Sequence, residues 1–164
     1  MSAGYSLRQA TPADSFTLLN LIRALAEYER LLHEVRATDA DLQAALFGER
    51  AGAGALIAEV ADQPVGFALW FYTFSTFTGR PGLYLEDIYV APEHRGRGIG
   101  RAIFRHLARL AQAEGCARLE WSVLDWNEPA RRFYAGLGAM PMSDWTVQRV
   151  SGPALSALAS AEEE

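Results

Sequence analysis

The chain has 164 residues, of which 50% are apolar and 21% are charged. It is long enough to form one hydrophobic core and does not require a second domain. A net charge of −5 argues against non-specific binding to nucleic acid, and no long apolar run or signal-like segment directs the chain to a membrane or to export. The single cysteine, Cys116, cannot form an internal disulfide, and these features favour a reducing cytoplasm.

The N-terminal part of the sequence predicts one strand and two capped helices. Residues 5–9 are expected to form the strand. Thr11 begins the first helix, because Pro follows at the first helical position and Asp14 stands where a capping box needs an acid. Thr38 begins a shorter helix that ends at Gly48.

The middle of the sequence predicts a sheet with both kinds of strand pairing. Residues 55–60 and 65–73 are rich in β-forming residues and are expected to pair as antiparallel strands. A strand over 83–90, a helix over 98–114 and a strand over 117–123 are expected to form a parallel βαβ unit.

The C-terminal part predicts a helix that Asn127 caps and that runs to about Leu137, then a last strand over 145–150. The final residues, 160–164, are expected to be a frayed tail. Together these elements predict an α+β fold: a single domain over residues 1–164, with a mixed, mostly antiparallel sheet flanked by helices.

A glycine-rich turn between the strand and the helix of the βαβ unit predicts an anion-binding site. Successive N–H groups can converge there at the positive end of a helix dipole. A dinucleotide-binding fingerprint is excluded because Arg101 stands where it needs Gly or Ala, and a phosphate-binding P-loop is excluded because the chain has no Lys. What remains is an Arg-x-x-Gly-x-Gly pattern that begins at Arg95. Three glycines mark the turn: Gly96, Gly98 and Gly100.

This pattern resembles the acetyl-CoA site of the GCN5-related N-acetyltransferase (GNAT) superfamily. The resemblance continues through Tyr-Leu-Glu-Asp at residues 84–87, through residues 117–127 and 127–138, and back to residues 25–29. At that level the whole chain is similar to the diamine (spermidine/spermine) and thialysine N-acetyltransferase branch. It implies a small amine substrate, acetyl-CoA as cosubstrate, direct attack in a ternary complex, and a homodimer.

The resemblance also implies which residues form the site. Those expected to hold acetyl-CoA are Ile88, Tyr89, Val90, Arg95, Gly96, Arg97, Gly98, Ile99, Gly100, Arg101, Asn127, Pro129, Ala130 and Tyr134. Those expected to contact the amine are Tyr28, Glu29, Glu86, Glu120, Trp121 and Ser122.

Glu86 is the candidate proton acceptor. A primary ammonium has a pKa of about 10.4, so its deprotonation at neutral pH costs about 4.6 kcal/mol. Strict alternation places Glu86 on the opposite face of its strand from Leu85 and Asp87. The resemblance implies that it draws off the proton through water. The alternative is a carboxylate in a structural ion pair.

Tyr134 is the candidate that assists departure of the CoA thiolate. A phenol with a pKa of about 10 is a weaker acid than a thiol with a pKa of about 8.5, so full proton transfer to the thiolate is uphill. We therefore expect Tyr134 to donate a hydrogen bond to the developing charge. The alternative is a tyrosine buried in the core beside Phe133.

Other polar residues carry weaker signals. A helical stripe of arginines indicates either contact with CoA phosphates at its start or a solvated helix face: Arg97, Arg101, Arg105 and Arg109. Arg131 and Arg132 are equally ambiguous. The histidines have no ligand partners at metal-binding spacing, so no metal site is expected: His33, His94 and His106.

Three functions stay open: a small-amine N-acetyltransferase, a protein acetyltransferase of the same fold, and a non-catalytic CoA-binding sensor. The loop over 74–80 contains no acid and looks more like that of the thialysine branch. We therefore expect thialysine, lysine or ornithine to be better substrates than spermidine. Arg80 is a candidate partner for the carboxylate of such a substrate, or a solvent-exposed loop residue.

Overall fold

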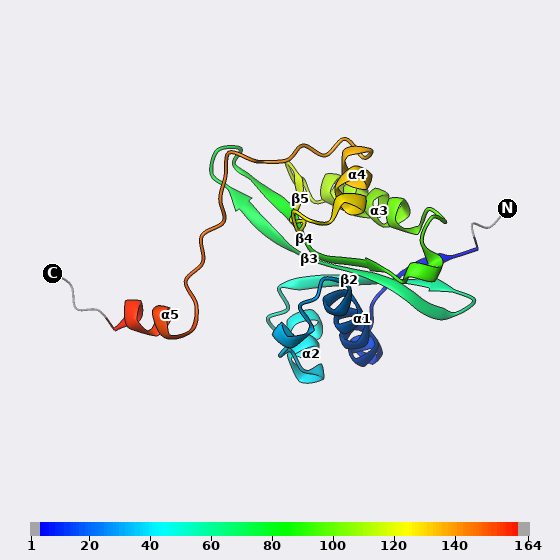
Figure 1. The fold of residues 1–164 in the computed structure, drawn as a ribbon, viewed down its shortest axis with the longest axis horizontal. Coiled ribbons are helices and arrows are strands. Elements are labelled where there is room, and N and C mark those ends of the chain that lie inside the picture. Colours follow the sequence, from blue (N-terminus) through cyan, green and yellow to red (C-terminus); the bar gives the residue numbers. More distant parts are fainter. Residues whose placement is uncertain (1–3, 161–164) are drawn as a thin grey trace. The chain divides into compact units, whose positions relative to one another are not determined.

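A five-stranded sheet lies at the centre of the part of the chain that ends at Asn127 in the computed structural model, which describes residues 4–160 (Figure 1). The first four strands pair antiparallel in sequence order, and the fifth pairs parallel to the fourth. This mixed sheet confirms the predicted fold class. Its strands are β1 Ser6–Gln9, β2 Ala53–Val60, β3 Gln63–Ser75, β4 Arg80–Val90 and β5 Leu119–Trp121.

Helices cover both faces of the sheet. The helices α1 Ser15–Tyr28 and α2 Asp39–Phe47 lie on one face, and α3 Ile99–Ala113 lies on the other (Figure 1). Both predicted helix starts are present: the Asp14 carboxylate accepts from the Thr11 N–H at 2.8 Å, and Thr38 forms a capping box with Asp41. The first of them opens a short 3-10 turn, Pro12–Asp14, which leads into α1; two further 3-10 turns are Leu32–Glu34 and Pro92–His94.

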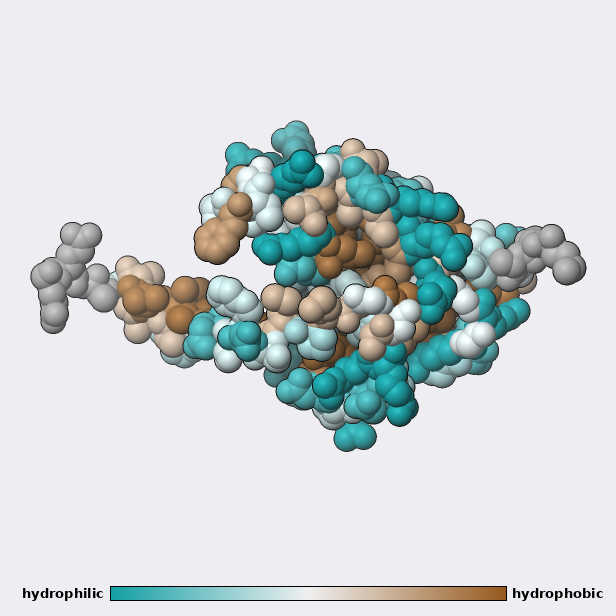
Figure 2. All heavy atoms as spheres, turned by 90° about the horizontal axis from the view of Figure 1, so that it is seen from above, coloured by the Kyte–Doolittle hydropathy of each residue, from teal (hydrophilic) through white to brown (hydrophobic). Residues whose placement is uncertain are grey.

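The core beneath α1 and α2 is apolar and tightly closed. Leu18 of α1, Ile57 of β2 and Phe67 of β3 are fully buried in one cluster. Burial of large apolar side chains is the main stabilising contribution to such a core. Polar and charged side chains appear in teal over much of the outer face drawn in Figure 2.

One charged network fixes the edge of this core. Arg8 donates from both terminal nitrogens to the Asp14 carboxylate, at 2.7 and 2.9 Å, and from Nε to Glu59 at 2.8 Å. These hydrogen bonds hold the pKa of Asp14 well below its usual range. They connect the N-terminus of α1 to β1 and β2.

β4 and β5 pair over only a short stretch. The parallel register runs from Leu83 opposite Leu119 to Leu85 opposite Trp121, which is shorter than the predicted strand over 117–123. Past Leu85, β4 continues to Val90 without a strand on that edge among the described residues. Its backbone groups there are open to pairing with an extended ligand.

The second compact unit of the chain begins at Glu128. It contains α4 Glu128–Ala135 and α5 Gly152–Ala159. The helix predicted after Asn127 is therefore confirmed, although it ends before Leu137. α5 was not predicted, although Ser151 and the Pro that follows Gly152 are ordinary helix-start residues.

The strand predicted over 145–150 is wrong, because these residues have no regular secondary structure. A strand needs a neighbour for its backbone hydrogen bonds, and the described part of this unit offers two helices and no strand. Residues 161–164 of the predicted tail lie outside the described residues. No helix within 4–160 is long and apolar enough to cross a membrane.

Candidate active site

The glycine turn has the backbone geometry that an anion site needs. Gly96 and Gly98 have left-handed φ angles of +74° and +85°, and Gly98 is the residue from which α3 begins. A Cβ atom placed on either glycine would meet nothing within 4 Å. The backbone conformation therefore requires glycine here, and the space beside the start of α3 is open.

Arg95 holds the turn in place. Its Nε donates to the Val90 carbonyl at 2.8 Å, and its guanidinium lies over the rings of Tyr28 and Tyr89, at 4.7 and 5.8 Å from their centroids. The side chain predicted to contact acetyl-CoA thus connects the end of β4, the glycine turn and the end of α1.

Tyr28 joins the glycine turn to the segment that precedes α4. Its hydroxyl donates to Asn127 Oδ1 at 3.2 Å, and its ring lies 6.1 Å from that of Trp126. Asn127 is buried. The Tyr28 side chain, predicted to contact the amine, is therefore engaged by Arg95, Trp126 and Asn127.

A register shift in β4 overturns the expected facing of its side chains. Leu69 of β3 pairs with Asp87, whereas the next residue, Trp70, pairs with Leu85, which leaves Glu86 without a partner. Paired residues share a face and successive residues alternate, so Asp87 and Leu85 lie on opposite faces. The prediction that Leu85 and Asp87 share a face is wrong. Asp87 lies on the α1 face with Leu69, and Glu86 is exposed.

Three acids form a cluster at this shift. Burial, together with the negative charges of Glu86 and Glu29, raises the pKa of Asp87 to about 6. Burial also raises the pKa of Glu29, at the C-terminal end of α1. A carboxyl group poised near neutrality beside two other acids suits binding of an ammonium group and acceptance of its proton.

Asp87 was not among the predicted site residues, because strict alternation placed it on the opposite face of the strand from Glu86. The available signal was the Glu-Asp pair inside an otherwise apolar strand.

Comparison with known proteins now decides the family. The model of the acetyltransferase (GNAT) family matches residues 18–139. The chain belongs to the GNAT family. It is an N-acetyltransferase, and it is similar to proteins that are named as acetyltransferases of amines.

The chain is similar to known proteins both in sequence and in structure, as two relatives and one solved structure show. It is 40% identical to the thialysine N-epsilon-acetyltransferase of Bos taurus, over 93% of this chain and 96% of that protein. It is 35% identical to the human spermidine/spermine N(1)-acetyltransferase-like protein 1, over 85% of this chain and 21% of that longer protein. An integron cassette protein from the mobile metagenome of V. cholerae has a TM-score of 0.80 at 26% identity, over 96% of this chain and 99% of that one.

The predicted amine-contacting residues Glu120, Trp121 and Ser122 lie in β5 or directly after it. Trp121 pairs with Leu85 and packs on Phe104 of α3, with ring centroids 4.7 Å apart, so it lies on the face opposite Asp87. Glu120 is paired with Arg118 at 2.9 Å. The Ser122 hydroxyl lies 2.7 Å from that of Tyr84.

The four arginines of the predicted stripe are exposed, just before α3 and along it. Its first member, Arg97, lies 3.2 Å from Nδ1 of His94, beside the glycine turn. Arg101, Arg105 and Arg109 face solvent, as a solvated helix face would.

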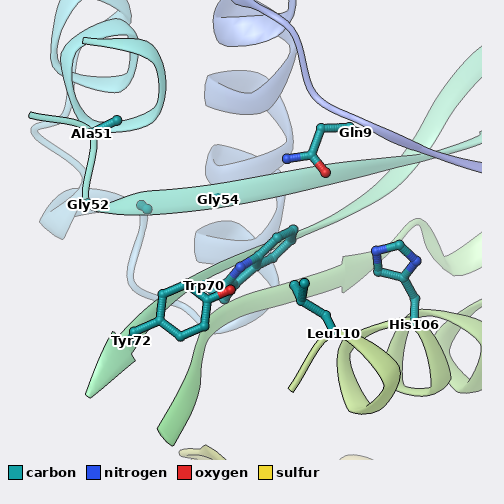
Figure 3. A pocket seen from close by; sticks show the side chains of 9 residues that line it. Gln9, Ala51, Gly52, Gly54, Trp70, Tyr72, His106 and Leu110 are labelled. Atoms are coloured by element: carbon teal, nitrogen blue, oxygen red, sulfur yellow. The ribbon is translucent and has the colours of Figure 1, made fainter. Parts of the chain in front are cut away.

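A cavity of about 360 Å³ lies on the face of the sheet that carries α3 (Figure 3). Trp70 and Tyr72 of β3 face His106 and Leu110 of α3 across it. Gly54 is required there, because a Cβ would lie 2.7 Å from the Trp70 ring. Trp70 shares its face with Leu85, so this cavity is separate from the acids around Asp87.

The predicted acetyl-CoA residues that follow Asn127 lie in the second unit. Pro129, Ala130 and Tyr134 belong to α4, where the Tyr134 ring lies 5.6 Å from that of Phe133. Their roles toward acetyl-CoA stay predictions.

Proposed function

We propose that this enzyme transfers the acetyl group of acetyl-CoA to the primary amine of a small amine, by direct attack in a ternary complex. One observation carries the proposal: an open glycine turn at the start of α3 follows, within one stretch of chain, the β4 acids Glu86 and Asp87, and the pKa of Asp87 is raised. In the reaction the amine nitrogen forms a bond to the acetyl carbon and the carbon–sulfur bond breaks. The ammonium proton goes to a carboxylate, and the thiolate leaves.

Acetyl-CoA is expected to bind along two features of the backbone. The N–H groups of residues 96–101 suit a pyrophosphate, because they converge where the helix dipole is positive. The unpaired edge of β4 over Ile88, Tyr89 and Val90 suits the amide groups of the pantetheine arm, which can pair with it as a strand would.

Asp87 and Glu86 are the groups we assign to the amine. An ionised Asp87 stabilises the incoming ammonium, and its raised pKa brings it closer to the pKa of the amine than an ordinary aspartate would be. Glu86 supports a water-mediated path, because it is exposed beside Asp87. Glu29 adds negative charge from α1.

Tyr134→Phe is expected to lower kcat while leaving acetyl-CoA affinity nearly unchanged. A hydrogen bond to a developing thiolate forms mainly in the transition state, so its loss appears in the rate, by about tenfold to a hundredfold. Steady-state kinetics together with calorimetric titration of acetyl-CoA measure both quantities. Phe133→Leu, which changes the neighbouring ring, is the control. A parent-like kcat in Tyr134→Phe contradicts the role.

The substrate class follows from the relatives and from the charge of the site. The thialysine N-epsilon-acetyltransferase relative and the absence of acids in residues 74–80 both favour an amine that carries its own carboxylate. We therefore expect kcat/KM for thialysine, lysine or ornithine to exceed that for spermidine. A thiol-release assay over this panel tests the proposal, and spermidine or spermine ahead by tenfold contradicts the preference.

The same assay separates the other two functions. A protein acetyltransferase prefers a lysine-containing peptide to the free amines, and a sensor binds acetyl-CoA without releasing thiol. We further propose one domain over residues 1–164 that acts as a homodimer in the cytoplasm. Light scattering that finds a monomer at micromolar concentration contradicts the homodimer.

A further inference from the structure

Arg30 adopts a backbone conformation that its side chain disfavours. It follows α1 with a left-handed φ of +62°. Its N–H donates to the Glu27 carbonyl at 3.0 Å, and the N–H of Leu31 donates to the Ala26 carbonyl at 2.7 Å. This is the Schellman arrangement that ends many helices, and glycine is the usual residue at the position of Arg30. An arginine in such a conformation calls for a compensating role.

The Arg30 side chain is positioned by an aromatic ring, and its positive charge has no acidic partner within residues 4–160. Its guanidinium lies 5.4 Å from the centroid of the Trp126 ring, a cation–π contact that fixes its place. The side chain is exposed, and it forms no ion pair within residues 4–160. A fixed guanidinium of this kind presents its N–H donors in the fork that matches a carboxylate.

Arg30 also directly follows an acid that acts on Asp87. Glu29 is its chain neighbour and acts on Asp87 through its charge. Trp126, beneath the guanidinium, contacts the ring of Tyr28. At the end of α1, a carboxylate of the acid cluster, that of Glu29, is therefore followed directly in the chain by the guanidinium of Arg30. An α-amino-acid head group carries the complementary pair, an ammonium and a carboxylate on one carbon.

We propose that Arg30 binds the α-carboxylate of an amino-acid substrate whose side-chain amine is acetylated, and so determines the preference for amino acids over diamines. The proposal rests on the proposed function and names the residue that selects its substrate. Glu29 faces the α-ammonium, and the side chain of the substrate extends toward Asp87 and Glu86.

The test compares substrates that differ only in the carboxylate: lysine with 1,5-diaminopentane, and ornithine with 1,4-diaminobutane. We expect the parent to favour the amino acid of each pair, and Arg30→Gly to lower the ratio of the two kcat/KM values at least tenfold through KM for the amino acid. Glycine suits the left-handed backbone, so this variant should be no less stable than the parent by thermal unfolding. Arg30→Lys should retain part of the ratio.

Two controls make the outcomes distinct. Arg23→Gln removes an exposed arginine from α1 and should leave the ratio unchanged. Arg80→Gln tests the other arginine that could hold the carboxylate, and a fall of the ratio only in that variant overturns the assignment to Arg30. An unchanged ratio in Arg30→Gly, with both amines still acetylated, also overturns it. A parent that acetylates none of the four amines instead refutes the proposed function.

Discussion

Gly98→Val is expected to weaken acetyl-CoA binding at least tenfold, which corresponds to about 1.4 kcal/mol. Gly98 begins α3 at a φ of +85°, where a β-branched residue is strained. The added side chain would also stand in the open space where we place the pyrophosphate, since a Cβ there meets no protein atom within 4 Å. Calorimetric titration with acetyl-CoA gives the dissociation constant directly.

Gly115→Val is the matched control for this variant. Gly115 lies past the other end of α3 with a φ of +70°, and a Cβ on it also meets nothing within 4 Å. Both variants should therefore lose stability by a similar amount, about 1–3 kcal/mol. Only Gly98→Val should lose affinity. Equal affinities in the two variants would show that the turn does not hold the ligand.

The local signals in this sequence predicted most of the first unit. At Thr38 the threonine side chain and Asp41 satisfy free backbone N–H groups, and at Thr11 the Asp14 carboxylate accepts from the backbone N–H, which are properties of a few adjacent residues. The glycine turn was predictable for the same reason, since only glycine adopts its φ angles without strain.

Features that depend on distant partners were not predictable in this way. The register shift at Glu86 arises from how β3 pairs with β4, and no pattern within β4 reveals it. Residues 145–150 have the composition of a strand but no neighbouring strand in their unit. The rings and carbonyl that hold Arg95 come from α1 and from the end of β4.

Asp87→Asn is expected to make the folded protein more stable and the enzyme far less active. The pKa of Asp87 is about 6 in the folded chain against an ordinary value of 3.8, so folding disfavours its charged form. Between these values the folded state holds the proton more tightly than the unfolded state. Stability therefore falls as pH rises through this window, and the full cost, on the order of 3 kcal/mol, is present above about pH 6.

The amide removes this charge and part of its cost. We expect a gain of about 1–2 kcal/mol in the free energy of unfolding at pH 7.5, which disappears below about pH 3, where the aspartate is neutral in both states. Urea unfolding at the two pH values measures it. Glu49→Gln, which removes an exposed charge, is the control and should change little at either pH.

The activity of the same variant reports on the proton transfer. If Asp87 accepts the proton, kcat/KM of the parent declines as pH falls below about 6, which gives the pH profile an acidic limb. Asp87→Asn should lose this acidic limb, and its kcat/KM should be about a hundredfold or more below that of the parent. Glu86→Gln removes a charge that raises the pKa of Asp87, so it should shift the limb to lower pH without abolishing it. The opposite pattern, in which Glu86→Gln abolishes the limb and Asp87→Asn only shifts it, would make Glu86 the proton acceptor and Asp87 the group that tunes it.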